Sequence, residues 1–293
     1  MKKKYVYLVF LIMFISLVLA SCIRADIPIL QQDEISDGFI AEDYSPYPIQ
    51  TKTIKGVDYS LSRNPVGKYG GVLIASTIGE GPKTFNSWNS MDATSSMASD
   101  IMFDSLVTTD AYTGEIIPKL AKIINILPDK KTYIIQLRKG LKWSDGKDIT
   151  AEDVFFTWNT IIFGGFGNTS TRDAMYIGNE LPKIEKIDKY TVKFTTPKPF
   201  SPFLRQLSVP IAPKHILEPV TKKGKKEFAS FWSSNIKPSE LVTSGAFKLK
   251  EYVPAQRIVY ERNPNYYVID EKGQKFMKDQ FNYYKKGNED EDE

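Results

Sequence analysis

The sequence predicts a mixed α/β fold, and three observations support this prediction. From residue 68 onward, segments with the alternation of a strand and segments with the spacing of a helix follow one another without an internal repeat. Apolar residues make up 42% and aromatic residues 13% of the 293 residues, which is enough for an ordinary hydrophobic core. The single cysteine excludes an intramolecular disulfide, so that core has to supply the stability.

The first 21 residues have the pattern of a signal peptide. Three lysines follow Met1, and the apolar run over residues 5–19 is too short for a comfortable membrane span, which needs about 20 residues. Small residues directly precede Cys22, as at the site where bacterial lipoproteins are cleaved and lipidated. A plain secretory signal with a chance cysteine is the alternative. Cleavage removes three of the 39 basic residues and leaves 36 against 35 acidic ones, so the mature chain is nearly neutral.

Residues 22–66 are predicted to be a tether and a loosely ordered lead-in. Asp, Glu, Pro and Gln recur there, and neither a period of two nor a period of 3.6 is sustained. The expected role of this segment is to hold the rest of the chain away from a membrane surface.

The core is predicted to begin after Lys68. A glycine-led apolar run over residues 70–76 indicates a strand. Residues 95–106 then carry apolar side chains at helical spacing and predict a helix. The apolar positions of this helix are Met97, Ile101, Met102 and Leu106.

A strand, a tight turn and a capped helix are predicted in succession from Thr132 onward. Polar and apolar residues alternate up to Arg138, with Ile134 as the exception, which is typical of a half-buried strand. Ser-Asp-Gly-Lys from residue 144 supplies turn residues. Thr150 and Asp153 have the spacing of a capping box. The helix face expected to be buried consists of Val154, Phe155, Trp158, Ile161 and Ile162.

Shorter elements are predicted further along the chain. Residues 183–187, 191–195 and 257–261 have strand patterns, and residues 202–207 and 213–220 have helical ones. Strands and helices therefore continue to alternate, as an α/β architecture requires.

The sequence contains no recognisable catalytic or metal-binding constellation. His215 has no second histidine or cysteine beside it, so a structural role is expected. Asp145, Glu152 and Asp153 could be imagined as an acid–base set, but a turn and a helix start suit them better. Residues 164–167, Gly-Gly-Phe-Gly, follow a helix and lack the Gly-Lys-Ser/Thr end of a phosphate loop, so they predict a helix stop. We therefore expect neither an enzyme nor a cofactor or metal. The near-zero net charge of the mature chain does not indicate nucleic-acid binding.

Several stretches resemble one known family. Residues 133–158, with Leu-Arg-Lys-Gly-Leu-Lys-Trp-Ser-Asp-Gly followed by Thr-Ala-Glu-Asp-Val, resemble the signature region of family 5 extracellular solute-binding proteins. That family comprises the oligopeptide, dipeptide and nickel receptors of bacterial ABC importers. Four more stretches follow in the order that the family uses, namely residues 81–86, 103–107, 211–217 and 244–249, the last leading to residues 261–267.

The resemblance implies a type II periplasmic-binding-protein-like fold with a first lobe and a small inserted lobe, and with the second large lobe missing. Family members extend much further than this chain, which stops where the second lobe should begin. The charged end cannot bury itself and is expected to be disordered. The implied division is a lipoprotein signal peptide at 1–21, a tether and lead-in at 22–66, the first lobe at 67–107 and 183–273, the inserted lobe at 108–182, and the tail at 274–293.

The resemblance also places ligand contacts in the segment after the first strand. Backbone groups there could pair with an extended peptide while Trp88 supplies an apolar wall. The alternative is that Phe85 and Trp88 belong to the core and that the rest is a loop. The polar loop over residues 168–172 is a weaker candidate. The candidate ligand-binding residues are Asn86, Trp88, Asn89, Met91, Asp92, Ala93, Thr94 and Ser95.

Two functions follow from the resemblance. The first is a lipid-anchored extracytoplasmic solute-binding component of an ABC importer, here truncated, on the periplasmic or extracellular face of the cell envelope. Its partners would be a peptide or other small solute, ABC permease subunits, the membrane through lipid on Cys22, and a separately encoded second lobe. A peptide, an oligosaccharide and a nickel chelate all stay open as ligands. The alternative is a non-transporting lipoprotein remnant or interaction module that retains only the first lobe.

Overall fold

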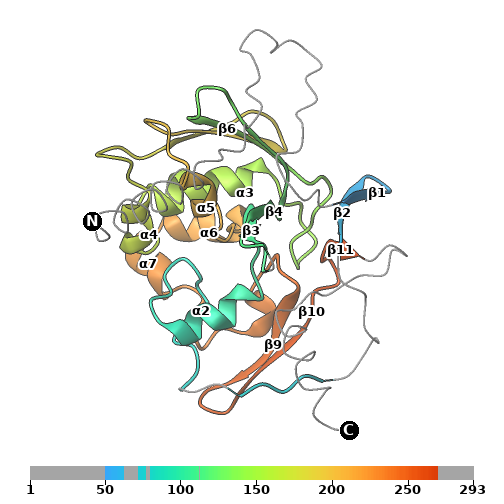
Figure 1. The fold of residues 1–293 in the computed structure, drawn as a ribbon. Helices are drawn as coiled ribbons and strands as arrows, with labels where there is room; N and C mark the ends of the chain where they lie inside the picture. The colour runs from blue at the N-terminus through green and yellow to red at the C-terminus, as the bar shows by residue number, and fades with distance from the viewer. Residues whose placement is uncertain (1–49, 63–71, 77–79, 112, 270–293) are drawn as a thin grey trace, which may run out of the picture. The chain divides into compact units, whose positions relative to one another are not determined.

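A computed structural model describes residues 50–62, 72–76, 80–111 and 113–269 (Figure 1). The predicted signal peptide, Cys22 and the tail over residues 274–293 lie outside these ranges. The elements in chain order are β1 (Thr51–Ile54), β2 (Val57–Leu61), α2 (Ala93–Asp100), β3 (Val107–Thr109), β4 (Ile116–Pro118), β5 (Ala121–Ile126), β6 (Thr132–Leu137), α3 (Ala151–Phe155), the π-helix η1 (Phe156–Ile162), α4 (Thr169–Ala174), β7 (Lys183–Lys186), β8 (Thr191–Thr195), α5 (Phe203–Gln206), α6 (Lys214–Thr221), α7 (Lys225–Ser230), the 3₁₀ helix η2 (Pro238–Glu240), β9 (Phe247–Val253), β10 (Arg257–Arg262) and β11 (Val268–Ile269).

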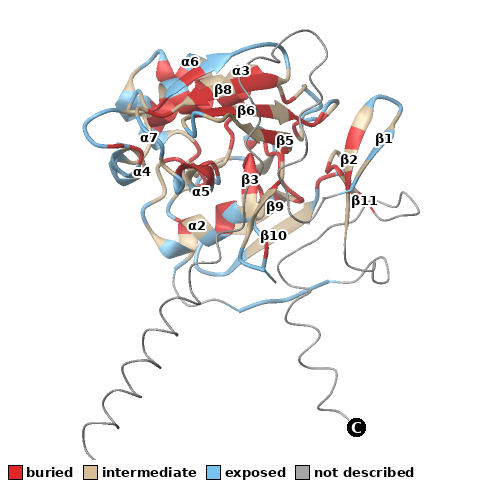
Figure 2. Ribbon diagram, turned by 45° about the horizontal axis from the view of Figure 1, so that its top comes forward, coloured by how far each residue is buried: buried red, intermediate tan, exposed pale blue. Residues whose placement is uncertain are grey.

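The largest sheet has four antiparallel strands in the order β5-β6-β8-β7. Its register pairs Tyr133 with Phe194 and Ile135 with Val192. These four side chains are buried, and Figure 2 shows the buried residues along β6 and β8. The alternation read from the sequence is therefore confirmed, and β7 and β8 confirm the two strands predicted near residues 183 and 191.

This sheet crosses the predicted boundary between the inserted lobe, residues 108–182, and the second part of the first lobe, residues 183–273. Strand β6 lies on one side of that boundary and β8 on the other, and they pair along the whole of β8. A boundary at residue 182 would divide one hydrogen-bonded sheet, so the sheet-bearing unit has to extend beyond Thr195. The division into lobes itself stays a prediction.

The helix after the Ser-Asp-Gly-Lys turn begins as predicted and then changes its winding. Thr150 and Asp153 form the capping box, with Thr150 N donating to Asp153 Oδ2 at 2.9 Å. The α-helix expected beyond Phe155 is instead the π-helix η1, in which Phe163 N donates to Trp158 O at 2.8 Å. Trp158 is completely buried, with its ring 5.2 Å from that of Phe194, so the wider turn still packs the predicted face on the sheet.

The lead-in predicted over residues 22–66 is wrong for residues 51–61. Strands β1 and β2 form a hairpin, and β2 also pairs in parallel with β11. Lys55 and Gly56 both have positive φ, at 51° and 80°, as a two-residue type I′ turn requires. Arg138, expected on the polar face of its strand, is 1% exposed because its Nη1 donates to Thr51 Oγ1 at 2.7 Å and so ties the hairpin to the sheet.

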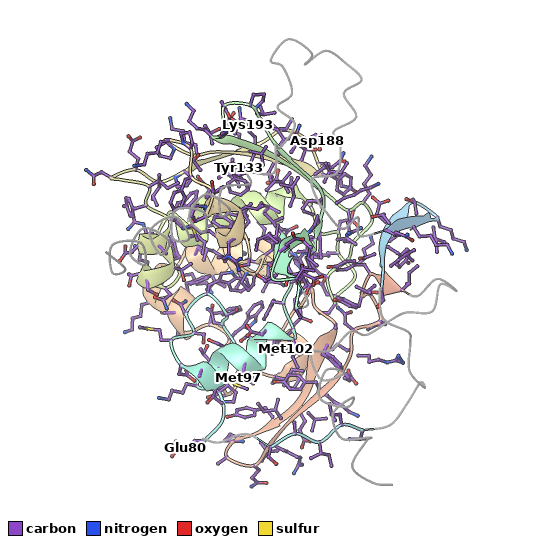
Figure 3. The ribbon with its side chains drawn as sticks, in the orientation of Figure 1. Glu80, Met97, Met102, Tyr133, Asp188 and Lys193 are labelled. Carbon is purple, nitrogen blue, oxygen red and sulfur yellow. The ribbon has the colours of Figure 1, made fainter. Side chains whose placement is uncertain are left out.

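Two expectations near the start of the core are also wrong. Residues 72–76 form no strand in the structure, and Val72 and Ile74 are 89% and 87% exposed, because no described strand pairs with them. Helix α2 ends at Asp100, since Met102 O accepts hydrogen bonds from Ser244 N and Gly245 N instead of continuing the helix. Met97, inside α2, is 62% exposed, whereas Met102, beyond the end of the helix, is buried (Figure 3).

The remaining elements surround the start of the core. Helices α5 and α6 confirm the helical segments predicted near residues 202 and 213, and β10 confirms the strand predicted at 257. Strands β9 and β10 form a two-stranded antiparallel sheet. Tyr252 from β9 meets Phe85 edge to face at 5.3 Å, and Tyr260 from β10 donates to Ala98 O. The β9–β10 sheet thus contacts both Phe85 and α2.

Candidate ligand-binding face

The segment before α2 is anchored by side chains that the sequence suggested as ligand contacts. Asn86 is completely buried, and its Nδ2 donates to Phe228 O at 2.8 Å and Phe231 O at 3.2 Å. Trp88 is 4% exposed, and its Nε1 donates to Pro210 O at 2.9 Å. The structure therefore favours the alternative in which Trp88 belongs to the core. The prediction that Trp88 supplies an apolar wall for the ligand is wrong.

Ser95 is the third buried member of the predicted set. Its Oγ accepts from Lys83 N at 2.9 Å and donates to Asp92 Oδ2 at 2.7 Å. Asp92 also caps α2 by accepting from Ser95 N at 2.9 Å. The pKa of Asp92 is lowered from its ordinary value, first by the hydrogen bond from the Ser95 backbone. This cap fixes the start of the helix and leaves the preceding residues at the surface.

Five predicted residues form the accessible part of this segment, which we call the rim: Asn89, Met91, Asp92, Ala93 and Thr94. Met91 is 84% exposed, an unusual position for a long apolar side chain. Asn89 is half-buried, and its Nδ2 has no hydrogen-bond partner among the described residues. The rim thus offers an exposed apolar side chain to a ligand, whereas the unpaired Asn89 Nδ2 is itself buried.

The second candidate segment adjoins the rim. Asn168 N donates to Trp88 O at 2.7 Å, and Asn168 Nδ2 donates to Ser90 O at 3.3 Å. Asn168 also caps α4 by accepting from Ser170 N at 3.0 Å. Residues 86–95 and 168–172 are far apart in the sequence, and only these tertiary hydrogen bonds show that they form one surface.

The glycine-rich run ends η1, as predicted. Gly165 has φ of 70°, and its backbone N donates to Ile162 O. The amides of Phe166 and Gly167 both donate to Ile161 O. Because these amides are all used by carbonyls of the preceding helix, they cannot cradle a phosphate.

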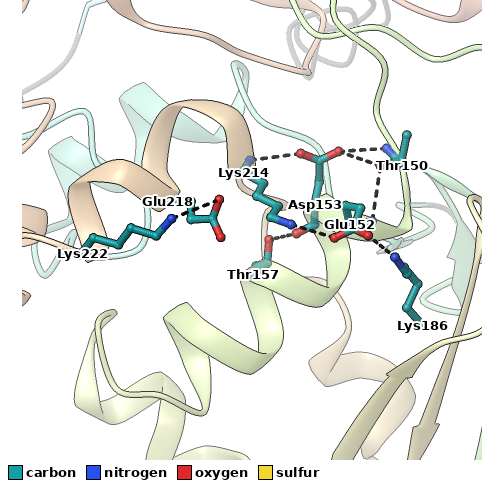
Figure 4. Close-up of polar contacts among 8 residues, drawn as sticks. All are labelled: Thr150, Glu152, Asp153, Thr157, Lys186, Lys214, Glu218 and Lys222. Atoms are coloured by element: carbon teal, nitrogen blue, oxygen red, sulfur yellow. Dashed lines mark hydrogen bonds and ion pairs between the residues drawn. The ribbon is translucent and has the colours of Figure 1, made fainter.

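The carboxylates weighed as an acid–base set have structural partners (Figure 4). Asp153 is buried and accepts from Thr150 N and from Lys214 N at 3.0 Å, so it joins α3 to α6. Burial raises its pKa from the ordinary value. Glu152 pairs with Lys186 and with Lys214. These contacts hold two helices and β7 together.

His215 also has a structural partner. Its Nε2 lies 2.7 Å from Asp145 Oδ2, which links α6 to the turn after Trp143. Within the described ranges, no group of three or more His, Cys, Asp or Glu residues could hold a metal ion. Nor is any helix of the described part long and apolar enough to cross a membrane.

The architecture and the sequence match one family of known proteins. The model of the bacterial extracellular solute-binding proteins, family 5, middle region, matches residues 115–289. The chain belongs to family 5 of these solute-binding proteins. An oligopeptide-binding protein of Bacillus subtilis, AppA, is 31% identical over 212 residues, which are 71% of this chain and 37% of AppA. A probable ABC transporter-binding protein of Deinococcus radiodurans is 35% identical over 164 residues, 55% of this chain and 27% of that protein.

Solved family 5 structures have the same fold. The periplasmic binding protein MelB of Agrobacterium fabrum, solved with stachyose, superposes with a TM-score of 0.57 and 27% identity over 68% of this chain and 32% of MelB. AppA of B. subtilis, solved with a nonapeptide, gives a TM-score of 0.52 and 29% identity over 64% of this chain and 37% of AppA. The fold is therefore that of a periplasmic binding protein, and the chain spans about a third of the length of these relatives.

Proposed function

We propose that this chain supplies one ligand-binding lobe of a lipid-anchored solute receptor for an ABC importer, and that its solute is a peptide. Membership of family 5 supports the receptor class, because the curated relatives are binding proteins and not enzymes. A peptide is favoured because AppA is named as an oligopeptide-binding protein and was solved with a nonapeptide. A protein of Escherichia coli named as dipeptide-binding is also 29% identical over 206 residues.

The rim is the surface proposed to contact the solute. Met91 and Ala93 are exposed, whereas Asn86, Trp88 and Ser95 are buried supports beneath them. An extended peptide lying along residues 89–94 would find partly exposed polar residues and the exposed Met91 side chain on one wall. The other wall would come from a second lobe, encoded separately or in a continuation of the chain, because sites of this class close two lobes over the ligand.

The anchor is proposed to be lipid on Cys22. Two or more acyl chains give a stable membrane hold that a single chain does not. The residues between Cys22 and β1 would then act as the tether that keeps the folded part clear of the surface. The permease subunits of the importer are the proposed protein partners.

Exposed apolar residues favour the alternative, a non-transporting interaction module. Val72, Leu73 and Ile74 are 89%, 59% and 87% exposed, which is unusual for three consecutive apolar side chains. A protein partner that covers them could replace transport as the function. Sequencing the DNA that follows the codon for Glu293 separates the two functions, since a second-lobe coding segment is expected only for a receptor.

Backbone NMR spectra of the mature chain, residues 22–293, test the proposed surface. Titration with a mixed peptide library should shift the amide signals of residues 89–94 more than those of the largely exposed strand β7, which belongs neither to the rim nor to residues 168–172. The proposal fails if no peptide shifts the rim, or if only signals elsewhere move.

A further inference from the structure

Two positively charged side chains converge in front of the glycine run that ends η1. A Cβ atom built on Gly165 would lie 3.3 Å from Lys225 Nζ and 3.6 Å from Arg172 Nη1, and these are the nearest heavy atoms outside the residues next to Gly165 in sequence. Gly165 has a positive φ of 70° and no side chain, so no Cβ crowds the two cationic groups. Arg172 comes from α4 and Lys225 from α7, which lie beside each other in Figures 1 and 2.

Neither charge has an acidic partner in the described part of the chain. Asp173 and Glu227 are close in sequence, yet no carboxylate oxygen of a described residue comes within 4.0 Å of Arg172 or Lys225. Arg172 Nε is buried and has no hydrogen-bond partner among the described residues. Two like charges held close together disfavour each other unless an anion lies between them.

Aromatic rings hold both side chains in place. The Arg172 guanidinium lies 5.9 Å from the centroid of the Tyr176 ring, and Lys225 Nζ lies 5.8 Å from that of Phe166. Such contacts restrain the long side chains without neutralising their charge. The pair is therefore positioned in advance and remains available to an anion.

The pair adjoins the rim. Asn168, which donates to Trp88 O and Ser90 O, lies one helical turn before Arg172, or about 6 Å along the axis. Four residues of an extended peptide span about 13 Å, since each adds about 3.3 Å. A short peptide on the rim can thus reach the two cations with one end or one side chain.

We propose that Arg172 and Lys225 form a carboxylate-binding subsite of the solute site. The inference rests on the proposed function and deepens it, because it favours a peptide with a free terminal carboxylate or an acidic side chain over a neutral sugar. A carboxylate oxygen in front of Gly165 would accept from Arg172 Nη1 and Lys225 Nζ together. Backbone amides take no part, because those of the glycine run are already used.

Three matched peptides test the subsite on the mature chain. The probes are acetyl-tetraalanine with a free carboxylate, acetyl-Ala-Ala-Asp-Ala amide, and acetyl-tetraalanine amide. Amide shifts of the rim give the dissociation constants. We expect the charged peptides to bind about tenfold more tightly than the neutral one, as hydrogen bonds to charged groups allow. Whichever charged peptide binds better tells whether a terminal or a side-chain carboxylate is recognised.

Variants assign the effect to the two cations. R172Q and K225Q should each reduce the preference to about twofold or less. K226Q removes the same charge from the neighbouring exposed lysine of α7 and should keep the preference, and K225R should keep it as well. Equal binding of the three peptides to the unaltered chain, or an equal loss in K226Q, would overturn the inference and leave the proposed function standing.

Acetate alone separates the two possible failures. The Nε–H signal of Arg172 should shift on addition of acetate in the unaltered chain and in K226Q, and should not shift in K225Q. If no peptide moves the rim while acetate moves this signal, the proposed function fails and the anion site stands. If acetate leaves the signal unchanged, the anion site fails whatever the peptides do.

Discussion

Replacing Trp143 by alanine should strongly destabilise the part of the fold around the Ser-Asp-Gly-Lys turn. Trp143 is completely buried, and its backbone is fixed by Lys147 O, Gly146 N and the side chain of Asn265. A buried aromatic side chain removes about 150 to 250 Å² from water. At about 25 cal/mol per Å² this area corresponds to about 4 to 6 kcal/mol. Measured large-to-small core changes of this kind cost about 3 to 5 kcal/mol, which is the range we expect.

Urea unfolding followed by far-UV circular dichroism measures this loss without relying on tryptophan fluorescence. The matched control is Met97→Ala, because Met97 is 62% exposed and its truncation should change the free energy of unfolding by no more than about 0.5 kcal/mol. A change of that small size for Trp143→Ala would refute the core assignment and would restore a binding role for the turn.

Three further changes test other parts of the account. Cys22→Ser should release the protein from the membrane fraction of the cells, and unchanged membrane association would contradict lipidation. Asn86→Ala should lower the free energy of unfolding in urea by about 1 to 3 kcal/mol, because two buried carbonyls lose their donor. Met91→Ala should change the free energy of unfolding by no more than about 0.5 kcal/mol and should weaken peptide binding. A stability loss in Met91→Ala together with weaker binding only in Asn86→Ala would contradict the roles given to the two residues. For Asp58, burial raises the pKa, but hydrogen bonds from Lys139 and Thr53 and the charge of Lys122 outweigh burial, so the pKa lies below 3.8. A lowered folded pKa adds stability above the unfolded value, and this stability is lost as pH falls through the folded pKa. The stability difference between the unaltered chain and Asp58→Asn should therefore shrink below pH 3.8, and a constant difference from pH 6 to pH 3 would show that Asp58 is not linked to acid unfolding.

Local patterns predicted the elements whose hydrogen bonds close within a few residues. The Thr150–Asp153 capping box and the turn at residue 144 depend on neighbours in sequence, so propensity and spacing were sufficient. The strand predicted at 70–76 failed because a strand also needs a partner, and its apolar residues are exposed without one in the described ranges. The end of α2 at Asp100 depends on Ser244 and Gly245, about 140 residues away.

The candidate site shows the same division between local and tertiary information. The sequence indicated residues 86–95 but could not separate the buried supports Asn86 and Trp88 from the exposed Met91, because burial is set by Phe228, Phe231 and Pro210. The adjacency of Asn168 to this segment also depends on tertiary hydrogen bonds. No sequence pattern around Lys225 indicates a role in binding. Only the position of α7 beside α4 brings it to Arg172.

Calorimetric titration of the mature chain with a mixed peptide library tests the central claim, that these residues form one wall of a two-lobe peptide site. Ligand pockets bury about 70 to 90% of a small ligand, and one wall cannot achieve this. The chain alone should therefore bind no more tightly than high micromolar to millimolar, equivalent to about 4 to 6 kcal/mol, and a recombinant second lobe from a genomic neighbour should tighten the binding. Nanomolar binding by the chain alone would show that the site is complete within these residues and would contradict the account.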